Sequence, residues 1–201
     1  MKLLKYLPLL LLLTSANLFA QNYTAQIEKF REDYKSDFLQ EKNSPLKQED
    51  LQYLRFYDAD SSYRVRAAAQ ILTAAPTFIM PVFSGTGREY APYALLNFKL
   101  KGKSMQLTVY RSLALAKIPS YKDYLLLLFT DETNGKTTYG GGRYIDMREG
   151  DFINGTVVID FNKAYNPYCA FSGGYSCPKP PDENHLDCEI LAGEKMFAKA
   201  H

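Results

Sequence analysis

An alternation of apolar and polar residues on both sides of a glycine turn constrains the fold of this chain most strongly. Residues 96–100 read LNFKL, and residues 105–109 read MQLTV. In an extended strand, residues two apart point to the same face of a sheet, so each stretch has one apolar face. The intervening Lys101-Gly102-Lys103 supplies a turn. The pattern therefore predicts an antiparallel hairpin with one buried face.

Helical and strand patterns occupy different parts of the chain. Apolar residues recur at three- and four-residue spacing from Tyr23 to Phe38, which predicts an amphipathic helix. Ser44 as an N-cap and Pro45 in the first turn predict a second helix to about Leu54. Further strands are expected at residues 63–72, 77–82, 124–130, 143–147 and 155–161. Because the helices come first, we expect a mainly β, α+β fold: an antiparallel β-sandwich or partial barrel with one or two N-terminal helices packed on it.

The N-terminal residues predict export. Lys2 and Lys5 precede an apolar run at residues 6–13 and a polar stretch that ends at Ala20. These are the features of a secretory signal peptide over residues 1–20, and the apolar run is too short to span a bilayer. We therefore expect a periplasmic or extracellular protein with no membrane span after the signal is removed. Its single globular domain is expected over residues 21–201, with a helical part at about 24–54 and a β-rich part at about 63–195.

The charge balance gives no indication of a nucleic-acid partner. The chain has 24 Lys and Arg against 22 Asp and Glu, and the predicted leader carries Lys2, Lys5 and no acid. The mature chain is then formally neutral, and it has no basic tract. We expect it not to bind nucleic acid.

The segments TYGGGRYID (138–146) and DFNKAYNPYC (160–169) predict a binding site. They combine glycines, aromatic rings, carboxylates and amides in a mixture that packing alone does not require. The chain has 16 tyrosines, and because a buried tyrosine needs a partner for its hydroxyl, several are expected to line a surface or a pocket. The candidate ligand-binding residues are Tyr139, Gly141, Arg143, Tyr144, Asp146, Asp160, Asn162, Tyr165, Asn166 and Glu183.

Two features of these segments have a structural interpretation beside the functional one. Gly140, Gly141 and Gly142 allow positive φ angles or the close approach of a ligand, but they fit a bulged turn equally well. Asn162 and Asn166 either bind a ligand or cap turns. The sequence leaves both alternatives open.

The cysteines predict a disulfide and not a metal site. In an exported chain Cys169 and Cys177 are the natural pair, which leaves Cys188 over. A zinc site of these three cysteines and His185 is disfavoured, because the spacing lacks the tight cysteine pairs typical of such sites. No metal site and no cofactor are predicted.

The amino-acid sequences of these segments resemble those of a bacterial family known as domain of unknown function 1684. The resemblance rests on YLRFYDADSSYRV, TGREY, YGGGRYID, DFNKAYNPYCAF, YSCPKPPDENHL and AGEK, and it spans nearly the whole mature chain. The positions that match the motifs are Tyr139, Gly140 to Gly142, Arg143, Tyr144, Asp146, Asp160, Asn162, Tyr165, Asn166, Pro167, Cys169, Cys177, Pro178, Pro181, Glu183, Asn184 and Lys195. The resemblance implies no particular activity, substrate or cofactor.

Binding of a small polar or amphipathic ligand is the function that the sequence favours. In this hypothesis Arg143 binds a carboxylate or phosphate of the ligand, Asp160 and Asn162 form hydrogen bonds with it, and tyrosines stack on its apolar part. Another possibility is an interaction domain of the cell envelope, in which the same segments form only a structural framework.

The alternative from a different class is a hydrolase-type enzyme. Cys169 or Tyr165 would be its nucleophile or acid, and Asp160 or Glu183 its base. We prefer binding, because no nucleophile, base and orienting group in the sequence complete a set.

Overall fold

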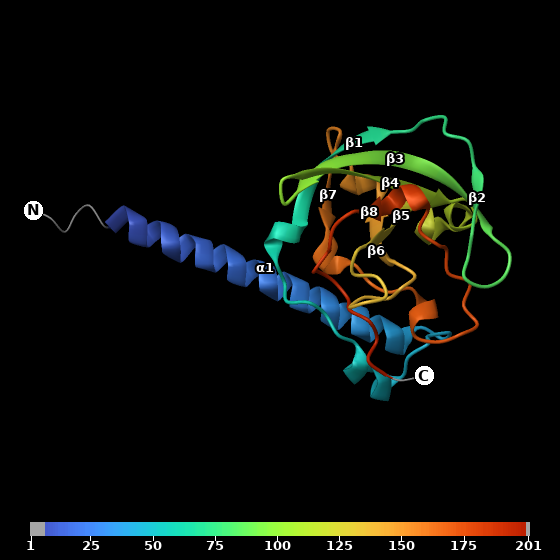
Figure 1. Ribbon diagram of the computed structural model, residues 1–201, viewed down its shortest axis with the longest axis horizontal. Helices are drawn as coiled ribbons and strands as arrows, with labels where there is room; N and C mark the ends of the chain where they lie inside the picture. Colours follow the sequence, from blue (N-terminus) through green and yellow to red (C-terminus); the bar gives the residue numbers. More distant parts are fainter. Residues whose placement is uncertain (1–6, 200–201) are drawn as a thin grey trace, which may run out of the picture.

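A curled sheet of eight strands dominates the computed structural model, which describes residues 7–199 and the side chains of residues 21–199. The strands are β1 (Arg64–Ile71), β2 (Phe78–Met80), β3 (Arg88–Leu100), β4 (Lys103–Ser112), β5 (Tyr124–Asp131), β6 (Arg143–Arg148), β7 (Thr156–Asp160) and β8 (His185–Leu186). Their order is β6-β5-β4-β3-β1-β7, with each neighbouring pair antiparallel, while β2 pairs with β3 and β8 runs parallel to β5. The sheet forms a half-barrel, as the arc of β3 shows (Figure 1). The predicted mainly antiparallel α+β fold is confirmed.

The hairpin of β3 and β4 follows the predicted register. Leu100 pairs with Lys103, and the two residues between them have positive φ angles, 49° for Lys101 and 81° for Gly102. Two consecutive positive φ angles match the twist of the flanking strands, which explains the glycine. Leu96 pairs with Leu107, and the predicted apolar face, including both of these side chains, is buried.

One long helix packs on the sheet. α1 (Leu7–Gln40) projects beyond the sheet at its N-terminal end, and its C-terminal half lies against the body of the protein (Figure 1). Ile27 and Phe38 are buried on the apolar face that the helical spacing predicts. The predicted leader, residues 1–20, lies outside the described side chains, so its function stays a prediction. Among the helices of residues 7–199, none is long and apolar enough to cross a membrane.

The second predicted helix is shorter and of another type. It is the 3-10 helix η2 (Gln48–Tyr53), and Ser44 does not cap it, because its Oγ accepts a hydrogen bond from the Leu46 N–H at 3.2 Å and closes a local turn. The other 3-10 helices are η3 (Ser61–Tyr63), η4 (Leu115–Lys117), η5 (Pro119–Tyr121), η6 (Glu149–Asp151), η7 (Phe161–Lys163), η8 (Tyr168–Ala170) and η9 (Asp182–Asn184). The predicted second helix is therefore present as a short 3-10 helix that begins at Gln48, and the prediction that Ser44 caps it is wrong.

Strand β5 is buried on both faces, which explains its continuous apolar sequence LLLLF. Leu125, Leu127 and Phe129 enter the main core inside the half-barrel. Leu126 and Leu128 point to the other side and pack in a second cluster that includes Tyr144 and Tyr90. The sheet therefore has a second covered face beside β5 and β6, and the candidate site lies there.

Shortening a side chain in the main core should lower the free energy of unfolding far more than the same substitution at the surface. Leu127 is 0% exposed and Leu39 on α1 is 47% exposed. We expect Leu127→Ala to lower the free energy of unfolding by about 2–5 kcal/mol, because it leaves a cavity, and Leu39→Ala to lower it by less than about 1 kcal/mol. Urea denaturation followed by circular dichroism measures both. Equal losses for the two variants would contradict the described core.

Candidate ligand-binding site

The side chains of β6 alternate between the core and a cavity. Arg143, Ile145 and Met147 are buried on the core side, as expected from the period of two along a strand. Tyr144 and Asp146 point to the opposite side, toward α1 and the segment of residues 163–178. A strand with one buried core face thus presents a tyrosine and a carboxylate to the space on its other face.

This space, here called the Asp146 cavity, has a volume of about 560 Å³. Its wall is mainly aromatic and consists of side chains from α1, the sheet and residues 165–175. The aromatic residues are Phe30, Tyr34, Phe38, Tyr90, Tyr124, Tyr144, Tyr165, Tyr168 and Tyr175. The charged residues are Asp33, Asp37, Glu41, Arg88, Asp146 and Lys163. The cavity combines broad apolar surface with a few charged groups, as small-molecule sites do.

Two tyrosine hydroxyls hold the Asp146 carboxylate. Tyr124 donates to its Oδ1 at 2.7 Å, and Tyr165 donates to the same oxygen at 2.5 Å. The side chain is exposed to the cavity, yet the surrounding walls reduce its access to bulk water. This desolvation raises the pKa of the Asp146 carboxyl, against the lowering effect of the hydrogen bonds from Tyr165 and Tyr124.

Both tyrosines stay protonated at neutral pH. Burial, followed by the negative charge of Asp146, raises the pKa of Tyr165 and Tyr124 well above the usual value. Each hydroxyl is therefore a permanent donor to the carboxylate, and Tyr165 is a poor nucleophile.

Arg143 does not face the cavity, unlike the sequence hypothesis that it binds a ligand anion. Its side chain is 0% exposed, and its Nη2 donates to Asp131 Oδ2 at 2.7 Å. It also donates to main-chain carbonyls of the C-terminal segment, with Ile190 O at 3.0 Å from Nη2 and Ala192 O bonded by Nη1, while its buried Nε has no hydrogen-bond partner. Arg143 is a structural residue because all of these partners belong to the protein itself.

Asp160 and Asn162 cap a turn and connect α1 to the sheet. Asp160 Oδ1 accepts from the Asn162 N–H at 3.1 Å and from the Tyr23 hydroxyl at 2.9 Å. The Asn162 side chain accepts from the Asp60 N–H at 2.9 Å and donates to the Asp60 carbonyl at 2.8 Å. These contacts correspond to the structural alternative for Asn162, and neither side chain lines the cavity.

The glycine turn also packs within the protein. At Gly141 an added Cβ would lie 2.4 Å from Phe83 Cζ, and at Gly142 it would lie 2.6 Å from the Phe129 carbonyl. Tyr139 packs its ring against Phe83 at 6.0 Å. Gly141 and Gly142 are required because other atoms of the protein come close, and Gly142 also has a positive φ angle of 88°. The close approach that these glycines allow is therefore to the protein and not to a ligand.

Asn166 and Glu183 likewise bond to other parts of the chain. The Asn166 amide donates from Nδ2 to the Lys195 carbonyl at 2.8 Å. Glu183 Oε1 accepts from the Tyr110 hydroxyl at 2.8 Å. Of the ten candidate residues, three line the Asp146 cavity: Tyr144, Asp146 and Tyr165.

The sequence pattern missed the contribution of α1 to the cavity. Tyr34 and Phe38 are part of the apolar helical face, which predicts core packing, and Asp33 and Asp37 have the spacing of a solvated face. The signal present in the sequence was the occurrence of tyrosine and acids next to each other along one helix. Only the packing of α1 against β6 shows that these side chains line a cavity.

Glu194 is a second residue that the sequence analysis missed. It is 0% exposed, and its Oε2 accepts from the Tyr34 hydroxyl at 3.0 Å and from the Asn166 N–H at 2.8 Å. Its Oε1 has no hydrogen-bond partner, and neither does the buried Asn166 Oδ1. Burial raises the pKa of Glu194 to about 8, so the carboxyl is protonated at neutral pH.

The cysteines separate into a bonded pair and a free thiol. Cys169 and Cys177 form a disulfide with their Cα atoms 6.2 Å apart, and Cys177 lies in the wall of the Asp146 cavity. Cys188 is free and half-buried, and burial raises the pKa of its thiol. Two of the four groups considered for zinc are thus bonded to each other.

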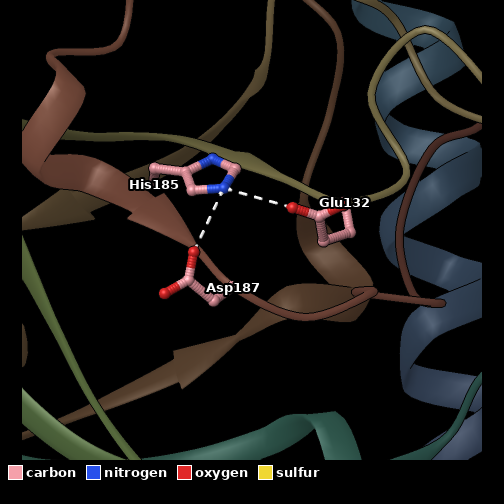
Figure 2. Close-up of side chains that lie close together, drawn as sticks. All are labelled: Glu132, His185 and Asp187. Carbon is pink, nitrogen blue, oxygen red and sulfur yellow. Dashed lines mark ion pairs between the residues drawn. The ribbon is translucent and has the colours of Figure 1, made fainter.

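His185, the histidine of that set, lies between two carboxylates. Its Nε2 lies 3.4 Å from Glu132 Oε1 and 3.5 Å from Asp187 Oδ1. Figure 2 shows both carboxylates directed toward this ring nitrogen. Within residues 7–199, this is the group of His, Cys, Asp and Glu whose geometry could hold a metal ion. All three side chains are exposed and none lines the Asp146 cavity. Exposed ion pairs of this kind contribute little to stability and need no metal to explain them.

Comparisons with other proteins support the fold but add no chemistry. A family model described as protein of unknown function (DUF1684) matches residues 49–195. The solution NMR structure of an uncharacterized protein from Haloarcula marismortui is similar, with 29% sequence identity and a TM-score of 0.67. The match covers 89% of this chain and 97% of that one. No protein with a curated description matches the chain.

The protonated Glu194 should make stability depend on pH. Because the folded state raises the pKa of this carboxyl to about 8, the folded state binds a proton that the unfolded state releases above about pH 4.3. Stability should therefore fall, by a few kcal/mol in total, as pH rises from about 4.3 to about 8. Glu194→Gln keeps a neutral group and should remove this slope.

Urea denaturation at about pH 5, 7 and 9 measures this slope. The control is Glu189→Gln, because Glu189 is exposed and its substitution should leave the slope of the original chain. A slope that Glu194→Gln leaves unchanged would show that Glu194 is ionised in the folded protein.

Proposed function

Since the chain belongs to the DUF1684 family, whose description assigns no function, we propose from the geometry of the Asp146 cavity that the protein binds a small amphipathic ligand. The observation that carries this proposal is a space of about 560 Å³ whose wall is rich in aromatic rings and into which the Asp146 carboxylate is directed. Ligand pockets typically have volumes of about 300–1,000 Å³ and combine apolar surface with a few placed polar groups. The cavity has both properties.

The aromatic wall is fixed by its own packing, which supports binding to a preformed site. The ring of Tyr165 lies 5.9 Å from the ring of Tyr144 and 5.8 Å from that of Tyr34. The Tyr144 hydroxyl also donates to the Pro178 carbonyl. Side chains held in this way lose little conformational entropy when a ligand binds, so their ordering does not weaken the affinity.

The residues of the hydrolase alternative are engaged in other interactions. Cys169 is in a disulfide, and the Tyr165 hydroxyl donates to Asp146 with a raised pKa. Asp160 caps a turn, and Glu183 accepts a hydrogen bond from Tyr110. A nucleophile must be free and close to a base, so these contacts favour binding over hydrolysis.

We also propose that the protein is exported after removal of residues 1–20. The leader pattern supports this proposal, as does the Cys169–Cys177 disulfide, because disulfides persist in oxidising compartments. The described contacts of α1 with the sheet begin at Tyr23, whose hydroxyl donates to Asp160, and continue with the buried Ile27. Cleavage after Ala20 would therefore leave these contacts of the helix intact.

Blocking the cavity should abolish binding of an apolar probe. Ser176 lines the cavity, whereas Ser172, on the same loop, is exposed and does not. We expect the fluorescence of N-phenyl-1-naphthylamine to rise saturably when it binds the original protein. Ser176→Trp should weaken this binding at least about tenfold, because the indole occupies the cavity, and Ser172→Trp should not.

Circular dichroism of both variants confirms that they fold. Equal affinities for the two variants would place the probe elsewhere on the surface. No saturable signal from the original protein would argue against a preformed apolar site.

Export should yield a shortened, oxidised chain. When the full-length chain is expressed in a bacterial host, we expect the protein in the periplasmic fraction or the medium, beginning at Gln21 and with the mass deficit of one disulfide. Intact mass spectrometry of each fraction measures this. The variant Leu10→Asp interrupts the apolar run and should keep the leader attached and the protein in the cytoplasmic fraction. An original chain that keeps residues 1–20 in the cytoplasm would contradict export.

A further inference from the structure

We infer that the ligand of the Asp146 cavity is an organic cation, an amine or quaternary ammonium group attached to an apolar body. This inference rests on the proposed binding function and names the chemical class of the ligand. Three observations carry it. One carboxylate oxygen of Asp146 accepts no hydrogen bond from the described residues, the carboxylate forms no ion pair with them, and aromatic rings line the cavity around it.

Asp146 has one oxygen available to a ligand. Both tyrosine hydroxyls, from Tyr124 and Tyr165, donate to Oδ1. Within residues 7–199, no hydrogen bond to Oδ2 is present, and the side chain is exposed to the cavity. The two tyrosines therefore fix the orientation of the carboxylate, while Oδ2 remains open to a donor such as an ammonium N–H.

Asp146 has no close ion-pair partner among the described residues, although the charge of Arg148 acts at longer range and lowers the pKa of Asp146, against the stronger raising effect of burial. No described Lys, Arg or His nitrogen lies within 4.0 Å of its carboxylate. Arg148, its neighbour along β6, instead pairs with Asp123 at 2.7 Å and donates to the Ser120 carbonyl at 3.0 Å. A carboxylate that is partly shielded from water and forms no ion pair gains most from a ligand that supplies a cation at short distance.

The aromatic walls suit a cation as well as an apolar group. The faces of tyrosine and phenylalanine rings attract cations within about 6 Å of the ring centre. The walls already show this property, since the Arg148 guanidinium lies 5.5 Å from the Tyr124 ring and the Lys163 ammonium lies 5.4 Å from the Phe30 ring. An aromatic wall that contains a carboxylate is the usual arrangement of sites for substituted ammonium ions.

The other charged groups of the cavity also favour a cationic ligand. Its acids are Asp33, Asp37, Glu41 and Asp146, against the cations Arg88 and Lys163. Arg88 and Lys163 are both exposed, and Lys163 already lies over the Phe30 ring. Asp33 is paired with Lys29 at 2.8 Å, and the three other acids outnumber the two cations. The field inside the cavity therefore favours a positive ligand over a negative one.

Three probes of similar size but different charge test the inference. They are 2-phenylethylamine, 2-phenylethanol and 3-phenylpropanoate, and titration calorimetry or NMR titration at neutral pH gives their affinities for the full mature protein. We expect the amine to bind at least about tenfold more tightly than the alcohol, and the acid to bind most weakly.

Two aspartate variants locate the source of the preference. Asp146→Asn keeps the shape of the side chain and should reduce the affinity for the amine to about that for the alcohol. Asp187→Asn is the control, because the Asp187 side chain is 98% exposed and lies outside the cavity, and it should change the affinity less than about twofold.

The outcomes separate this inference from the proposed function. Equal binding of amine and alcohol, or tighter binding of the acid, overturns the inference of a cationic ligand and leaves cavity binding standing. A preference for the amine that survives Asp146→Asn also overturns it, because the charge that selects the ligand would lie elsewhere. If no probe binds and the dye N-phenyl-1-naphthylamine also fails to bind, the proposed function itself fails.

Discussion

The buried ion pair of Arg143 and Asp131 is the interaction on which the rest of this structure depends. Both side chains are completely enclosed, and the guanidinium also bonds the carbonyls of Ile190, Ala192 and Glu194. Arg143 is on β6 and Asp131 ends β5, so one residue connects two strands to the C-terminal segment. Removal of one partner would leave a buried charge uncompensated, which typically costs about 3–5 kcal/mol.

The effects of this ion pair extend to the cavity. By binding the carbonyls of residues 190–194, Arg143 holds the segment that carries Glu194, which contacts Tyr34 on α1 and the main chain of Asn166. Tyr34 lines the cavity directly, and Asn166 follows Tyr165, the donor to Asp146. The cavity wall thus depends on a hydrogen-bonded connection between the core of the sheet and the helix. Three buried atoms of this connection have no hydrogen-bond partner: Arg143 Nε, Asn166 Oδ1 and Glu194 Oε1.

Much of the fold could be predicted from the sequence, and about a third of the candidate site. The alternation around Lys101-Gly102 gave the hairpin, and the helical spacing from Tyr23 to Phe38 gave the packed face of α1. Among the candidate residues, Tyr144, Asp146 and Tyr165 line the cavity, whereas Arg143 is enclosed in the core. Composition alone could not separate them, because a polar side chain that binds a ligand and one that bonds the main chain look the same in sequence.

The sequence by itself determined the α+β class, the positions of most strands, and the concentration of polar and aromatic groups in residues 138–195. These properties are local, since they follow from the period of a strand or helix and from turn residues. Only the tertiary structure decided which groups face the cavity. Neighbouring residues of β6 such as Arg143 and Tyr144 point in opposite directions, and both faces of the sheet are covered there. Whether a covered face becomes solid core or a cavity depends on how α1 and residues 163–178 pack over it. The contacts of α1, such as that of Tyr34 with Tyr165, join residues more than a hundred positions apart.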